Sequence, residues 1–179
     1  MSLFVATLLP GLLLAVLGGL LASNQSLVTA SLKALPRSAT AAMYLFGGAA
    51  VWFMWITWHS SPSDNFEHPV LLTVAFGVIA ALSFKCVPDF LAVRGLAVLV
   101  LLAAWHLRAA AYMEYDQPLR LLMVTPLFLL IALAIWLGVQ PYRLRDFFEW
   151  LFVRPVRARS LGAGLLGYGL LLVIVAFTY

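Results

Sequence analysis

Six long apolar segments with very few charges constrain this chain more than any other feature. They cover residues 3–22, 41–58, 67–86, 95–113, 121–139 and 161–177. A helix needs about 20 mostly apolar residues to cross the hydrocarbon core of a bilayer, and each segment has about that length. Only 10% of all residues are charged, whereas a soluble domain has roughly 25%. The sequence therefore predicts an all-α, polytopic integral membrane protein whose residues 1–179 form a single domain of six transmembrane helices.

The basic residues indicate how these spans are threaded. Lys and Arg gather on the cytoplasmic side because positively charged loops resist translocation. The second and fourth loops hold only Arg108 and Arg120, together with a few acidic residues. The remaining basic residues belong to the first, third and fifth loops: Lys33, Arg37, Lys85, Arg94, Arg143, Arg145, Arg154, Arg157 and Arg159. We therefore predict three helical hairpins in a plasma or inner membrane, with both termini on the non-cytoplasmic side.

The first segment has a second interpretation, as a secretory signal, because the apolar run 12–21 is followed by small and polar residues. A signal peptide normally carries positive charge ahead of its apolar core. Here no Lys or Arg precedes Lys33. We therefore expect an uncleaved first span.

Several classes of function are disfavoured by what the sequence lacks. A single cysteine, Cys86, excludes an intramolecular disulfide and gives no spacing typical of a zinc or iron–sulfur site. The HExxH, GxSxG and P-loop motifs are also absent from the sequence. The basic residues are scattered among apolar segments, which argues against a nucleic-acid partner. We expect a protein that is not an enzyme and that needs no cofactor.

Three histidines are nevertheless candidate ligands. His59, His68 and His106 all fall in the half of the predicted bundle that faces away from the cytoplasm. Imidazoles at similar depth on neighbouring helices can ligate a haem or hold a chlorophyll-type pigment. His106 is the best placed, because it lies within an apolar run. The alternative is that His59 and His68 are hydrated loop residues and that His106 hydrogen-bonds to a neighbouring helix.

Arg108 marks a second candidate site. A charge inside the bilayer is costly unless its side chain reaches the interface or finds a partner. We expect the guanidinium to reach the outer interface, where Glu114 or Asp116 can accept hydrogen bonds. Arg108 and Glu114, together with Trp105 and His106, predict an outward-facing polar pocket for an anionic solute or a quinone headgroup.

The fifth loop predicts an amphipathic helix over residues 142–154. Its aromatic and aliphatic residues recur at helical spacing among basic neighbours, which is typical of a helix that lies along the membrane surface. The sharper alternative is a docking surface for another subunit. The residues that would form it are Arg143, Arg145, Phe148, Trp150 and Arg154.

Small residues in the last segment predict close helix packing. Ser160 with Gly164, and Ala163 with Gly167, form two small-xxx-small pairs. Such pairs let two backbones approach closely in a membrane. We expect this span to contact another helix, either within the bundle or in another subunit.

These observations favour an accessory or scaffold subunit without a catalytic centre, which packs against lipids, pigments or partner helices in a larger complex. A small transporter or channel for an anionic or small polar solute is the first alternative. The second is an electron-transfer subunit that binds haem, quinone or a pigment.

Overall fold

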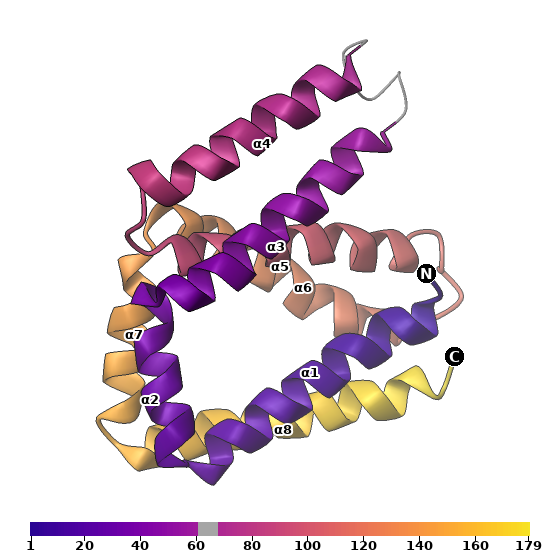
Figure 1. Ribbon diagram of the computed structural model, residues 1–179. Coiled ribbons are helices and arrows are strands. Elements are labelled where there is room, and N and C mark those ends of the chain that lie inside the picture. Colours follow the sequence, from indigo (N-terminus) through magenta and orange to yellow (C-terminus); the bar gives the residue numbers. More distant parts are fainter. Residues whose placement is uncertain (61–67) are drawn as a thin grey trace. The chain divides into compact units, whose positions relative to one another are not determined.

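The computed structural model describes residues 1–60 and 68–179, and within them every regular element is helical (Figure 1). The helices are α1 (Leu3–Ser23), α2 (Ser26–Ala34), the 3-10 turn η1 (Leu35–Arg37), α3 (Ala39–Trp58), α4 (Pro69–Cys86), α5 (Leu91–Ala111), α6 (Arg120–Val139), α7 (Tyr142–Phe152) and α8 (Pro155–Ala176). Among the described residues, α1, α3, α4, α5, α6 and α8 are long and apolar enough to cross a membrane. The predicted all-α class with six candidate spans is confirmed. Glu67, the first residue of the third predicted span, lies outside the described residues, as does Asp64.

Local chemistry sets several helix ends. The Ser2 hydroxyl accepts from the Val5 N–H at 3.4 Å and the Ser38 hydroxyl accepts from the Ala41 N–H at 3.1 Å. Each thus satisfies a backbone donor that has no partner within the first turn of its helix. Pro69 and Pro155 begin α4 and α8, where proline costs nothing because its missing N–H would be unpaired there.

The short helix α2 follows α1 directly and is not among the elements that the sequence predicts. It has 9 residues, which is too few to cross a bilayer. A prediction based on apolar segments of membrane length therefore does not include it. The Lys33 ammonium lies 5.9 Å from the centre of the Phe152 ring, so the end of α2 contacts the end of α7.

The chain forms two compact units. Unit 1 contains residues 1–33, 103–133 and 145–179, and unit 2 contains residues 34–102 and 134–144. The divisions fall inside α2, α5, α6 and α7, so each of these helices contributes to both units.

In unit 1, α1 and α8 lie side by side along their length and run in opposite directions (Figure 1). A Cβ atom on Gly18 would lie 2.3 Å from the backbone nitrogen of Leu166, and one on Gly162 would lie 2.4 Å from that of Ala22. At such distances the atoms would overlap, because non-bonded carbon atoms are in van der Waals contact at about 3.5 Å. The two backbones can therefore touch only because these positions carry no side chain.

The same contact repeats two turns further along. A Cβ on Gly169 would lie 2.4 Å from the backbone nitrogen of Ala15, and one on Gly11 would lie 3.0 Å from that of Val173. Within each helix the two glycines are spaced by about two helical turns and so share one face. This face is the seam of unit 1.

The core of unit 1 draws on four helices. α1, α5, α6 and α8 each contribute buried side chains, and the Tyr168 hydroxyl of α8 donates to the backbone carbonyl of Leu122 in α6. At the chain ends the rings of Phe4 and Phe177 meet edge to face, with centroids 5.4 Å apart. The buried residues of this core are Leu3, Ala6, Ala104, Ala111, Met123, Leu127 and Leu172.

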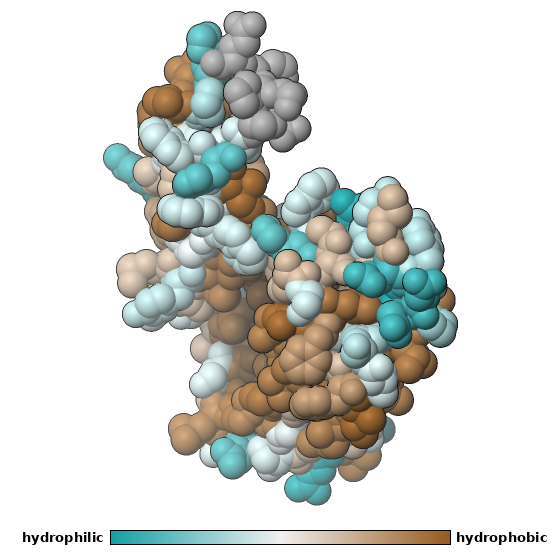
Figure 2. All heavy atoms as spheres, turned by 90° about the vertical axis from the view of Figure 1, so that its right-hand side faces the viewer, coloured by the Kyte–Doolittle hydropathy of each residue, from teal (hydrophilic) through white to brown (hydrophobic). Residues whose placement is uncertain are grey.

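In unit 2, α3 and α4 are joined by aromatic contacts. The rings of Phe46 and Phe84 lie 5.4 Å apart and those of Phe53 and Phe76 lie 4.9 Å apart, both edge to face. A Cβ on Gly95 would lie 2.3 Å from the backbone nitrogen of Phe46, so the start of α5 also approaches α3 closely. No residue of α4 is buried. Apolar side chains lie widely on the surface of the molecule, as the face drawn in Figure 2 shows.

The predicted packing pairs of the last span lie on a different side of α8 from its seam with α1. Ser160, Ala163, Gly164 and Gly167 are all exposed, and a Cβ added to Gly164 or Gly167 would meet nothing within 4 Å. Within this chain α8 therefore packs through other glycines than those pairs. Packing of the four residues against another subunit stays a prediction. The arrangement as three hairpins and the side of the termini also stay predictions.

We expect Gly169→Ala to lower the thermal stability of the purified protein in detergent, because the added methyl group must push the α1 backbone away. Overpacking of this kind typically costs about 1–3 kcal/mol. Gly164→Ala is the matched control on the same helix and should leave the melting temperature unchanged or higher. Equal melting temperatures for the two variants would contradict the glycine seam.

Candidate functional site

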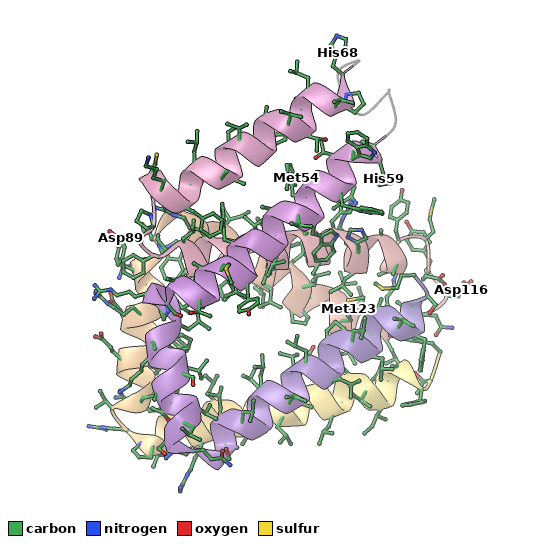
Figure 3. All side chains as sticks on the ribbon, viewed as in Figure 1. Met54, His59, His68, Asp89, Asp116 and Met123 are labelled. Carbon is green, nitrogen blue, oxygen red and sulfur yellow. The ribbon has the colours of Figure 1, made fainter. Side chains whose placement is uncertain are left out.

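The turn between α5 and α6 gathers two arginines and several aromatic rings within unit 1. α5 ends at Ala111, and Met113 then adopts a left-handed conformation with φ of 70° that reverses the chain. Backbone bonds from Gln117 to Glu114 (3.2 Å) and from Arg120 to Gln117 (3.2 Å) complete the turn. Asp116 lies in this turn, as Figure 3 shows.

An open pocket of about 220 Å³ lies at this turn. Arg108 lies in the last turn of α5 and Tyr112 directly follows that helix, while Arg120, Val124 and Phe128 follow each other at steps of four on α6. Residues at this spacing share one helix face, which explains how two helices line one pocket. The remaining lining residues are Ala111, Met113, Tyr115 and Leu121.

Arg108 does not form the predicted contact with an acidic residue. Its guanidinium instead lies over the Trp105 ring, 4.8 Å from the ring centre. Trp105 is three residues earlier and therefore on the same helix face, which makes it a nearer partner than any residue of the turn. Glu114 and Asp116 are exposed, and among the described residues neither forms an ion pair with Arg108.

Arg120 closes the turn and was missing from the predicted pocket. One of its terminal nitrogens donates to the backbone carbonyl of Ala111 at 2.9 Å, and the guanidinium lies 4.6 Å from the centre of the Tyr115 ring. The Ala111 carbonyl belongs to the last turn of α5, where carbonyls lack a partner in the helix. The signal in the sequence was a basic residue just ahead of an apolar run, which also fits a simple interfacial anchor.

The predicted pocket is therefore brought together only in part. Arg108 lines the pocket and Trp105 stacks beneath it, whereas Glu114 and His106 are exposed and are not among the lining residues. His106 belongs to unit 1, and His59 and His68 belong to unit 2.

His59 and His68 lie at the same end of the hairpin formed by α3 and α4 (Figure 3). The Nδ1 of His59 is 2.9 Å from the Trp55 carbonyl, and its ring lies 4.1 Å from the Trp55 ring. His68 precedes Pro69 at the start of α4 and is exposed. Among the described residues no group of three or more His, Cys, Asp or Glu is placed to hold a metal ion. Haem or pigment ligation by these histidines stays a prediction.

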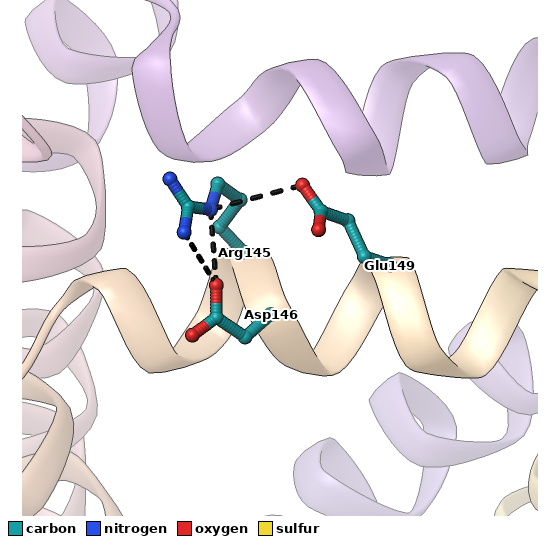
Figure 4. Close-up of polar contacts among 3 residues, drawn as sticks. All are labelled: Arg145, Asp146 and Glu149. Carbon is teal, nitrogen blue, oxygen red and sulfur yellow. Dashed lines mark hydrogen bonds and ion pairs between the residues drawn. The ribbon is translucent and has the colours of Figure 1, made fainter.

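Helix α7 (Tyr142–Phe152) covers most of the segment 142–154 for which we predict an amphipathic helix. Arg145 donates to Asp146 at 2.7 Å and lies 3.7 Å from Glu149 (Figure 4). The hydrogen bond to Asp146 and its negative charge raise the pKa of Arg145 above its ordinary value. The Arg145 guanidinium already contacts two carboxylates of α7, so fewer of its N–H donors are available to bind a partner.

The other residues of the predicted docking surface are arranged differently. Arg143 donates to the Gln140 side chain at 3.2 Å and lies 5.4 Å from the centre of the Tyr142 ring. Arg157, which was not predicted there, stacks on Trp150 at 4.5 Å and donates to its carbonyl at 3.0 Å. Phe148 is half-buried, while Trp150 and Arg154 are exposed. Docking through α7 stays a prediction.

Comparison with known proteins adds no assignment. No protein-family model matches the chain, and neither a curated protein nor a solved structure matches it.

We expect Arg120→Gln to destabilise unit 1 by about 1 kcal/mol, the typical net value of a hydrogen bond, because the Ala111 carbonyl loses its donor. Thermal melting in detergent measures the loss, and hydrogen exchange at residues 112–117 localises it to the turn. Arg108→Gln is the control, since that guanidinium contacts Trp105 and not the turn. A turn that exchanges no faster in Arg120→Gln than in Arg108→Gln would refute this role.

Proposed function

We propose that this chain is a non-catalytic integral membrane subunit that packs against lipids, pigments or partner helices of a larger assembly. The observation that carries the proposal is α4, a helix long enough to cross the membrane in which no residue is buried. Its rings meet α3 on one side. The rest of its apolar surface requires a cover from outside the chain, which lipid or a neighbouring subunit supplies.

The exposed face of α8 supports the same proposal. Gly164 and Gly167, with Ser160 and Ala163, leave a shallow strip along α8. Helices associate in lipid through close van der Waals contact, because lipid tails are as apolar as the side chains and provide no hydrophobic driving force. A shallow strip allows the closest approach of a partner helix.

We propose a plasma or inner membrane as the location, with both termini and the α5–α6 turn on the non-cytoplasmic side. The distribution of Lys and Arg among the loops supports this orientation. The meeting of Phe4 with Phe177 is consistent with it, because it requires both chain ends on one side.

The orientation predicts that Cys86 faces the cytoplasm. This cysteine is exposed at the end of α4 and is the single cysteine of the chain. A membrane-impermeant maleimide should label it only after permeabilisation of intact cells. Asp116→Cys in a Cys86→Ser background should be labelled without permeabilisation. The opposite pattern would reverse the proposed topology.

The assembly itself is tested by purification in a mild detergent. We expect a fixed set of membrane subunits to co-purify in constant stoichiometry, and we expect the double variant Gly164→Leu with Gly167→Leu to lose them. Gly48→Leu is the control, because Gly48 of α3 is exposed and also has nothing within 4 Å of an added Cβ. A chain that purifies alone, or equal loss in the control, would count against the proposal.

A small transporter or channel for an anionic solute is the second candidate function. The pocket lined by Arg108 and Arg120 favours it, because two cations are placed to meet an anion. Solute flux in proteoliposomes that contain only this chain would support the transporter over the accessory subunit. A haem or chlorophyll absorption band that disappears in His106→Ala would instead support electron transfer.

A further inference from the structure

We infer that the pocket at the α5–α6 turn binds the phosphate group of an anionic phospholipid, with an acyl chain of the lipid lying along α6. This inference is independent of whether the chain serves as an accessory subunit. It rests on the charge, the shape and the position of the pocket.

The charge of the pocket is unbalanced. Arg108 and Arg120 line the same space of about 220 Å³, and among the described residues neither forms an ion pair. Two like charges beside one pocket repel each other, and the repulsion is stronger near the low-dielectric membrane than in water. An anion between the two guanidinium groups offsets this repulsion, and a phosphate group supplies the negative charge.

The guanidinium groups also have donors to spare. Each guanidinium carries five N–H donors, and Arg120 uses one terminal nitrogen on the Ala111 carbonyl. The Arg108 guanidinium lies over the Trp105 ring and the Arg120 guanidinium over the Tyr115 ring, and a contact with a ring face leaves the N–H donors available. Arginine held in this way is well suited to phosphate, which it contacts through paired hydrogen bonds.

The pocket also has an apolar lining. Leu121, Val124 and Phe128 of α6 line it together with the arginines. A free phosphate or a phosphorylated solute would gain nothing from these side chains. An amphiphile gains from both parts of the lining, because its headgroup meets the arginines while its chain covers Val124 and Phe128.

The position of the pocket favours the same ligand. It lies where α5 ends and α6 begins, and the ends of membrane-spanning helices lie at the level of the lipid headgroups. A lipid phosphate is therefore already at this depth, at high local concentration. The ligand class is an anionic glycerophospholipid such as phosphatidylglycerol.

Native mass spectrometry of the full chain, released from detergent with added lipid, tests this inference. We expect phosphatidylglycerol to bind more tightly than phosphatidylcholine. Arg108→Gln should weaken phosphatidylglycerol binding about tenfold, equivalent to the loss of one charge-assisted hydrogen bond. Arg37→Gln is the matched control, because Arg37 also stacks on a ring, that of Phe90 at 5.4 Å, and its loss changes the net charge equally.

Two further measurements make the result decisive. Val124→Ser should weaken phosphatidylglycerol binding without changing the charge, and glycerol 3-phosphate should not displace the lipid. Equal binding by wild type, Arg108→Gln and Arg37→Gln would overturn the inference. Displacement by glycerol 3-phosphate would also overturn it, because the site would then recognise a soluble anion. Melting temperatures without lipid show that Arg108→Gln remains folded.

Discussion

The structure of unit 1 depends on the direct contact of two backbones, those of α1 and α8. In a membrane the hydrophobic effect does not hold helices together, so the contact must be close enough for dispersion forces and exact enough in shape to displace lipid. Gly18 and Gly162 provide that closeness, since a Cβ on either would overlap the opposite backbone. The buried residues of α5 and α6 then pack against a frame that these glycines define.

Much of the fold follows from the sequence because the bilayer leaves few choices. Every backbone polar group inside the hydrocarbon must be paired within its own segment, so a long apolar run has to be a helix. That argument yields the all-α class and the candidate spans, and the helical spacing of aromatic and aliphatic residues among basic neighbours yields α7. The argument does not predict α2, because this helix is too short to span the bilayer. α2 instead follows directly after α1.

The sequence was less informative about which face of a helix meets which. Gly162 and Gly169 are seven residues apart, whereas the pairs that we expected to pack are four residues apart. Both spacings place small residues on one face of the helix. Only the position of the partner helix decides which of the two faces is packed. The same limit applies at the polar site, where Arg108 stacks on Trp105 although a carboxylate was the expected partner. Arg120 joins the pocket because the turn folds back, which no spacing along the chain reveals.

The pairing of α1 with α8 has a consequence for biogenesis. α1 is synthesised long before α8, so the glycines of α1 face lipid while the intervening chain is made. Contacts between segments so distant in sequence form late and slowly. A chain interrupted before α8 therefore leaves the glycine face of α1 open, and such an open seam can be recognised for degradation.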